Sequence, residues 1–170
     1  MLAADLSLRP RLVFSTGADP YQFLIKVGTQ SPATHAAIGL GDRLLHAYEV
    51  GVVLEPRDYW FGDMQQQLIA EYAILPDVSA GVREAFRHLG KKYDIAGAVK
   101  IGLLRALQVF GSPLQSLGPI SDEAHTCACF AMLLDPYGLR IPEWRWIRRE
   151  SVVPGDLLRA CKGPSFWRTA

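Results

Sequence analysis

Short apolar runs separated by turn residues dominate the first half of the chain, and this pattern is typical of β-strands. Strands are expected at residues 11–16, in two runs within 34–47, at 50–54 and at 67–75. Residues 21–27 are apolar and aromatic, and they fit either a short helix or an extended segment. Because consecutive strands joined by short turns pair antiparallel, we expect an antiparallel sheet of about four to six strands.

The most distinctive stretch of this region reads T-H-A-A-I-G-L-G-D-R-L-L-H-A at residues 34–47. Gly41 and Asp42 are turn residues, so the apolar runs on either side are expected to form a hairpin. His35 then lies on one strand and His46 on the next. Paired strands lie about 5 Å apart, so two imidazoles on one face can hydrogen-bond to each other or to a shared third group.

The spacing of apolar residues becomes helical in the second half of the chain. Residues 79–89 predict a helix with Ser79 as its cap and Gly90 as its C-terminal glycine. Residues 93–110 and 121–134 predict two more helices, the last with an acidic pair in its first turn. Strands followed by helices predict an α+β fold in which the helices pack against the sheet.

The composition is that of an ordinary globular protein. The chain has 170 residues, of which 49% are hydrophobic, so we expect one domain, residues 1–170, with a buried core. A net charge of +1 makes nucleic acid an unexpected partner, and no run approaches the roughly 20 apolar residues of a transmembrane segment. Trp144, Trp146 and Trp167 lie among arginines, and we expect their rings to pack on the core rather than to stack on bases.

The first residues and the cysteines bear on the cellular compartment. Residues 1–10 include Asp5 and lack a basic start followed by a long apolar segment, so no secretory signal is expected. The protein is expected to be cytoplasmic as synthesised, and a role at the periplasm or cell wall then requires lysis, a phage or a secretion system. Three cysteines, an odd number, argue against a disulfide framework and for a reducing compartment.

The residues with chemical potential are Cys127, His35 and His46. A thiol in the first turn of a helix lies near unpaired N–H groups, which lower its pKa and offer donors to an oxyanion. A histidine beside the thiol acts as a base, and a second polar side chain orients that histidine. The three residues therefore fit the roles of nucleophile, base and orienter. The alternative interpretation is that they are buried packing residues, because a buried free cysteine behaves as a small hydrophobe.

Other chemistries fit the sequence less well. A zinc site could use both histidines with Cys127 and Cys129, but two cysteines two apart on a helix point about 200° apart. A serine hydrolase would need a G-x-S-x-G motif, and the sequence has none. We therefore expect neither a metal nor a cofactor.

Four stretches carry a resemblance to a known family. They read S-P-A-T-H-A-A-I-G-L-G-D-R-L-L-H-A, L-G-K-K-Y-D-I-A-G, T-C-A-C-F and S-V-V-P-G-D-L, and they extend from about Ser31 to Leu158. Their order resembles the circularly permuted branch of the NlpC-type papain-like cysteine hydrolases, the YiiX/YaeF-like proteins. The resemblance implies a papain-like α+β fold with the nucleophile at a helix N-terminus.

The resemblance also assigns roles to individual residues. His35 matches the family's S-H-x-x-I strand, and His46 matches the third polar residue on the strand that follows. The family motif C-S-E-F aligns with residues 127–130, which places Cys127 at the nucleophile and Cys129 at the glutamate position. Because the sequence departs from the motif there, both cysteines are candidates, and Cys127 is favoured. Tyr93 matches a tyrosine that helps to hold the oxyanion in relatives; alternatively, it is a core aromatic residue with a solvated hydroxyl.

Three functions follow as hypotheses. The first is a cysteine hydrolase that cleaves amide bonds in peptidoglycan peptides or other short peptides through a Cys-His-His triad. The second is a lipid acyl hydrolase or acyltransferase that resembles the lecithin retinol acyltransferase group, although the N-C-E-H-F motif of that group is missing here. Exposure of the apolar segment 95–107 near the site would favour this second function. The third is a domain of the same fold that binds without catalysis.

Overall fold

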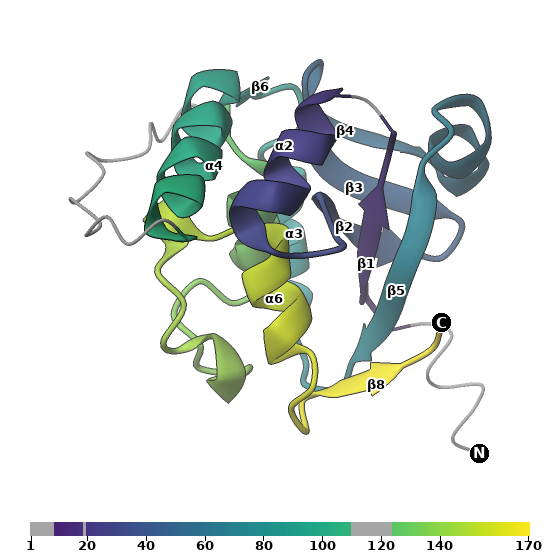
Figure 1. Ribbon diagram of the computed structural model, residues 1–170. Coiled ribbons are helices and arrows are strands. Elements are labelled where there is room, and N and C mark those ends of the chain that lie inside the picture. The colour runs from purple at the N-terminus through teal and green to yellow at the C-terminus, as the bar shows by residue number, and fades with distance from the viewer. Residues whose placement is uncertain (1–8, 19, 110–123) are drawn as a thin grey trace.

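A six-stranded antiparallel sheet forms the centre of the fold (Figure 1). The structure is a computed structural model that describes residues 9–18, 20–109 and 124–170. In spatial order the strands are β4 (Gly51–Pro56), β3 (Arg43–Tyr48), β2 (His35–Leu40), β1 (Arg11–Thr16), β5 (Gln67–Ile74) and β8 (Phe166–Arg168). Each neighbouring pair is antiparallel, which confirms the predicted α+β class with an antiparallel sheet.

The predicted histidine hairpin is confirmed. Leu40 pairs with Arg43 across the two-residue turn, and Gly41 has a φ of +62°, a backbone conformation that favours glycine. The other predicted strands are also present, each within a few residues of its expected limits. Strand β8 was not predicted, because three residues are too few to show an alternating pattern.

Within the described residues the α-helices are α2 (Pro20–Thr29), α3 (Ser79–Phe86), α4 (Ile95–Val109), α5 (Cys127–Ala131) and α6 (Pro154–Ala160). The open choice at residues 21–27 is thus resolved as a helix, and α2 lies beside α4 (Figure 1). Single turns occur at η1 (Tyr59–Asp63), η2 (Met132–Leu134), η3 (Pro142–Trp144) and η4 (Arg149–Ser151). The part of the chain that the structure describes contains no helix both long and apolar enough to cross a bilayer.

The start of α3 differs from the prediction. Ser79 is the first helical residue rather than the cap, and the side chain of Val78 at the cap position makes no capping bond. The carboxylate of Asp77 instead accepts the N–H of Ser79 at 2.9 Å. Asp77, two residues upstream, therefore provides the acceptor for the N–H of Ser79, which has no acceptor within the helix.

The third predicted helix begins later than expected. Residues 124 and 125 form the short strand β7 (Ala124–His125), which pairs in parallel with β6 (Lys92–Tyr93). Thr126 is the N-cap, and its side chain accepts the N–H of Cys129. The predicted start at 121 and its acidic pair lie outside the described residues. Cys127 is consequently the first residue of α5, and the β6–β7 pairing holds Tyr93 near that helix start.

Side chains of the sheet alternate between two buried faces. One face carries the main core, in which Phe14 and Ile38 pack with Phe130 of α5. The other face carries a smaller cluster of Val13, Ala37, Leu44 and Trp60.

The expectation that the C-terminal tryptophans pack on the core holds for one ring: Trp144 is buried, whereas Trp146 and Trp167 are exposed.

Candidate active site

Two histidines and a glutamate form a continuous hydrogen-bonded chain on β2, β3 and β4. Nε2 of His35 lies 2.8 Å from Nδ1 of His46, and Nε2 of His46 lies 2.9 Å from Oε1 of Glu55. The hydroxyl of Tyr48 donates to the second carboxylate oxygen, Oε2, at 3.1 Å. The hairpin thus brings the two predicted histidines into direct contact and adds a carboxylate behind them.

Glu55 was missed because the strand after the hairpin was expected to end at residue 54. In the structure β4 continues to Pro56, and His46 pairs with Val53. Side chains alternate along a strand, so Glu55 lies on the same face as Val53 and diagonally opposite His46. Extending the alternation by one residue would have identified it.

Trp60 is a second residue that the sequence did not identify. Its ring centre lies 4.7 Å from that of His35 and 4.5 Å from that of His46, and it is buried in η1. Its indole N–H donates to Oγ of Ser15 at 3.0 Å. The ring packs against both imidazoles and shields their hydrogen bond from water. Residues 57–63 have no regular apolar spacing, so no sequence signal pointed to this contact.

Burial sets the charge of the histidine nearer the cleft. Burial lowers the pKa of His35 well below 6.5, and the neighbouring His46 lowers it further. At neutral pH the His35 ring is therefore uncharged. An uncharged imidazole has a free lone pair and can accept a proton.

The thiol of Cys127 meets β2 beside His35. Burial raises the pKa of this thiol, whereas hydrogen bonds from the N–H groups of Ala36 and Ala128 and from the hydroxyl of Tyr93 act to lower it. The prediction of a lowered pKa at the helix start is therefore wrong, because burial outweighs these donors. Ala36 follows His35 directly in the chain, so the sulfur lies against the backbone of the strand that carries the histidine.

Cys129 lies in a different environment. Its sulfur accepts the Nε–H of Arg149 at 3.4 Å, and the residue belongs to the main core beneath the sheet. Cys127 instead lines a small cavity of about 30 Å³ together with Tyr93 and Thr34. Of the two candidate cysteines, Cys127 is the one next to a cavity and an N–H of the histidine strand.

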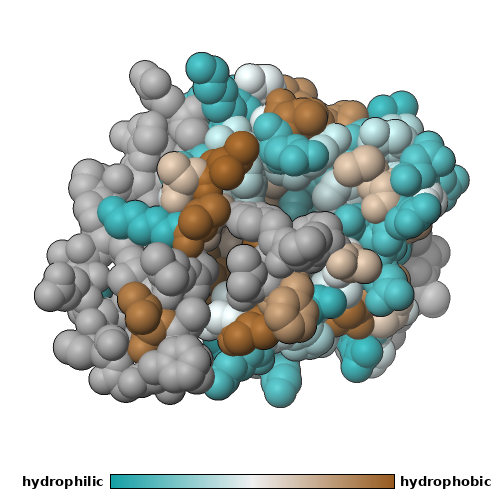
Figure 2. All heavy atoms as spheres, turned by 45° about the horizontal axis from the view of Figure 1, so that its top comes forward, coloured by the Kyte–Doolittle hydropathy of each residue, from teal (hydrophilic) through white to brown (hydrophobic). Residues whose placement is uncertain are grey.

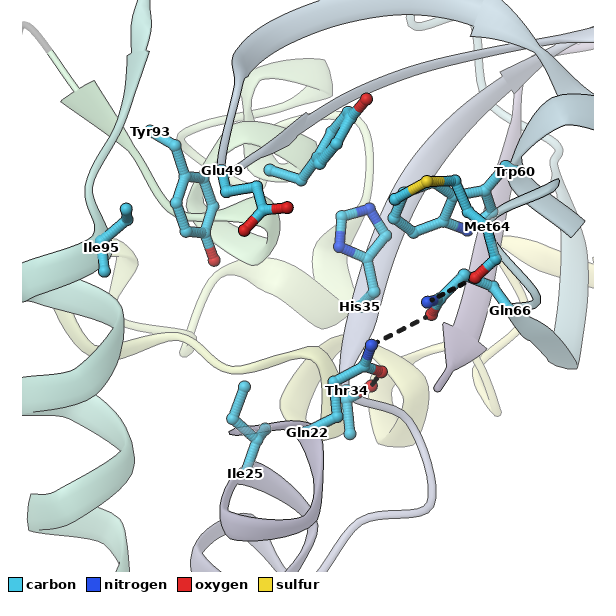
Figure 3. Close-up of a pocket in the computed structure, with 11 residues that line it drawn as sticks. Gln22, Ile25, Thr34, His35, Glu49, Trp60, Met64, Gln66, Tyr93 and Ile95 are labelled. Atoms are coloured by element: carbon cyan, nitrogen blue, oxygen red, sulfur yellow. Dashed lines mark hydrogen bonds between the residues drawn. The ribbon is translucent and has the colours of Figure 1, made fainter. Parts of the chain in front are cut away.

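An open cleft of about 480 Å³ lies in front of His35 (Figure 3). Ile25, Thr34 and Tyr93 line both this cleft and the small cavity at Cys127. The cleft and the cavity at the thiol therefore adjoin along these three side chains. Figure 3 shows the ring of His35 facing the cleft and the hydroxyl of Tyr93 pointing into it.

The cleft is lined by one carboxylate together with polar and apolar side chains. Glu49 is the only carboxylate among the described lining residues, and in Figure 3 its side chain reaches between Tyr93 and His35. The other lining side chains are Gln22, Ile25, Thr34, Tyr48, Trp60, Met64, Gln66 and Ile95. Such a cleft can hold a short chain with both polar and apolar groups, and its acidic side favours a cationic group.

Among the described residues, no group of three or more histidine, cysteine, aspartate or glutamate side chains is arranged to hold a metal ion.

The comparisons with known proteins leave the family open. No protein-family model matches this chain, and no curated protein matches it either.

Proposed function

We propose that this protein is a cysteine hydrolase of the permuted NlpC-type papain-like class, which cleaves amide bonds in peptidoglycan peptides or other short peptides. One observation carries the proposal. His35 opens onto the cleft, is hydrogen-bonded to His46, and is followed by Ala36, whose N–H binds the thiol of Cys127. The proposed nucleophile, base and orienter lie on α5, β2 and β3, which contact one another.

The reaction assigned to these residues has two steps. Nε2 of His35 is engaged with His46, so Nδ1 takes the proton of the Cys127 thiol while the sulfur attacks the amide carbon. The backbone N–H of Cys127 and the hydroxyl of Tyr93 stabilise the oxyanion. His35 then gives the proton to the leaving amine, which departs as the C–N bond breaks. Water hydrolyses the resulting thioester, with His35 as the base, and restores the thiol.

The cleft supports a peptide substrate with a cationic group. Glu49 supplies a carboxylate at the cleft, and Ile25, Met64 and Ile95 supply apolar contacts. Peptidoglycan peptides carry amino groups on short chains and fit both features. A volume of about 480 Å³ lies within the range of small-ligand sites.

Replacement of the nucleophile tests the proposal. Cys127→Ala should abolish release of new amino groups from muropeptides, as read by mass spectrometry. The matched control is Cys129→Ala, which removes the neighbouring thiol and should retain turnover. An active, folded Cys127→Ala protein would overturn the assignment.

A second function, acyl-ester hydrolysis or acyl transfer on lipids, is favoured by one observation. Ile95 and Val99 of α4 are 53% and 48% exposed, and Ile95 lines the cleft. Figure 2 shows apolar side chains at the surface of the face that it views. An exposed apolar helix beside the site can contact acyl chains.

One assay separates the candidate functions. The protein is incubated in parallel with muropeptides and with labelled phospholipid vesicles, and the products are identified by mass spectrometry. Amide cleavage supports the first function and loss of an acyl chain supports the second. If neither substrate changes and Cys127 reacts with a thiol probe no faster than free cysteine, the protein binds without catalysis.

A further inference from the structure

Glu55 makes two hydrogen bonds that fix its position behind the histidine pair. Oε1 contacts Nε2 of His46 at 2.9 Å, and Oε2 accepts the hydroxyl of Tyr48 at 3.1 Å. The side chain of Glu55 is 12% exposed and that of His46 is fully buried. A buried histidine bonded to a largely buried carboxylate has little freedom to rotate.

When both rings are neutral and Glu55 is ionised, these contacts assign a position to the proton on each imidazole. An ionised carboxylate only accepts hydrogen bonds, so Nε2 of His46 must carry the hydrogen. In neutral His46 the other nitrogen, Nδ1, is then an acceptor. Nε2 of His35, at 2.8 Å from this acceptor, must donate. In neutral His35 the lone pair consequently lies on Nδ1, the nitrogen that the proposed mechanism uses as the base.

We propose that Glu55 is a positioning residue that acts through His46 to fix the reactive tautomer of His35 and to stabilise the imidazolium formed during the reaction. This inference rests on the proposed function and extends it from a triad to a chain of four groups. When His35 takes the thiol proton, a positive charge forms in a largely buried site. The negative charge of Glu55, one imidazole away, lowers the energy of that state.

Other ionisable groups surround the chain and contribute to its field. Glu49 and Tyr93 share the cleft with His35, and Cys127 lies on α5 beside β2. Tyr48 contacts Glu55 directly, and both Tyr59 and Glu49 act electrostatically on Tyr48. Among the carboxylates of the described residues, Glu55 is the one shown in contact with a histidine of this pair. Its removal should therefore have an effect that loss of a distant carboxylate does not.

The test is Glu55→Gln, with Glu84→Gln as the matched control. Glu84 is partly exposed on α3 and pairs with Arg87, so its replacement removes the same charge away from the site. Glu55→Gln should lower kcat by about tenfold to a hundredfold, leave KM nearly unchanged and shift the acid limb of the kcat/KM profile. Glu84→Gln should match the wild type. Unchanged kcat and an unchanged pH profile in Glu55→Gln would overturn the inference.

A second measurement is independent of turnover. Nitrogen NMR of the free protein reports which ring nitrogen of His46 carries hydrogen, and Nε2–H is expected in the wild type. Glu55→Ala should mix the two tautomers, and if that variant does not fold, Glu55→Asp should do so by withdrawing the carboxylate from the ring. A fixed Nε2–H tautomer in every folded variant contradicts the role of Glu55. Absence of hydrolysis by the wild type, with the expected tautomer shift present, refutes the proposed function instead.

Discussion

Burial opposes charge on both central side chains of the candidate site. It lowers the pKa of His35 and raises that of Cys127, so the resting pair is a neutral imidazole and a neutral thiol. In the proposed reaction the proton must therefore move as the sulfur attacks the substrate carbon. This arrangement avoids a permanent ion pair in a buried site, where desolvation would be costly.

The lowered pKa of His35 predicts that stability depends on pH. Below about pH 6.5 the unfolded histidine binds a proton that the folded one excludes, so the free energy of unfolding should fall as the pH falls. The slope from this group is at most about 1.4 kcal/mol per pH unit. Urea denaturation at a series of pH values measures this slope, and the unfolding free energy of His35→Gln should depend less steeply on pH. Equal slopes in the two proteins would contradict the burial of a neutral His35.

Removal of the Tyr93 hydroxyl tests its oxyanion role. Tyr93→Phe keeps the ring that lines both the cleft and the cavity at the thiol but removes the donor, and kcat should fall by about a hundredfold. The measurement is steady-state hydrolysis of a muropeptide, with circular dichroism as a check of folding. An unchanged kcat would reduce Tyr93 to a packing residue that lines the cleft.

Individual elements show which parts of the site the sequence could predict. The hairpin was predictable because Gly41 and Asp42 form the turn, and the turn sets the register of the two strands that carry the histidines. The role of Glu55 was not predicted, because the strand that carries it was expected to end at residue 54. The contact between Trp60 and the histidines depends on how η1 folds over the sheet, which no local pattern encodes.

Thr126, the N-cap of α5, is expected to stabilise the start of that helix. Thr126→Ala removes the acceptor for the N–H of Cys129 and should cost about 1 kcal/mol of unfolding free energy. Thr126→Ser retains the hydroxyl and should keep most of this unfolding free energy. Chemical denaturation of both variants is the measurement, and equal stability of Thr126→Ala and the wild type would show that the cap is dispensable.

On the scale of the whole molecule, a buried carboxylate links distant parts of the sheet. Glu71 on β5 binds Arg11 of β1 at 2.8 Å and Arg57, just after β4, at 2.6 Å. Burial alone would raise the pKa of Glu71, but the hydrogen bonds from Arg57 and Arg11 hold it below its usual value. The glutamate is thus ionised in the folded protein and joins the central strands to the segment that precedes η1.

Loss of this charge should destabilise the protein. Glu71→Gln weakens both charged hydrogen bonds, and we expect a loss of about 2 kcal/mol in the free energy of unfolding. The surface variant Glu84→Gln removes a partly exposed carboxylate and should change stability little. Thermal and urea unfolding compare the two, and an equally small effect of both would contradict a structural role for Glu71.

The central claim is that Cys127 and His35 act on one another. Its most direct test is the rate at which iodoacetamide alkylates Cys127 near neutral pH, with peptide mapping by mass spectrometry to separate it from Cys129 and Cys161. In the wild type, Cys127 should react faster than the other two cysteines, because it adjoins a cavity and can pass its proton to His35 as the sulfur attacks the reagent. His35→Ala should slow this alkylation by about tenfold or more, because the thiol is neutral at rest and the base that takes its proton is gone. Equal rates for Cys127 in the wild type and in folded His35→Ala would contradict the account.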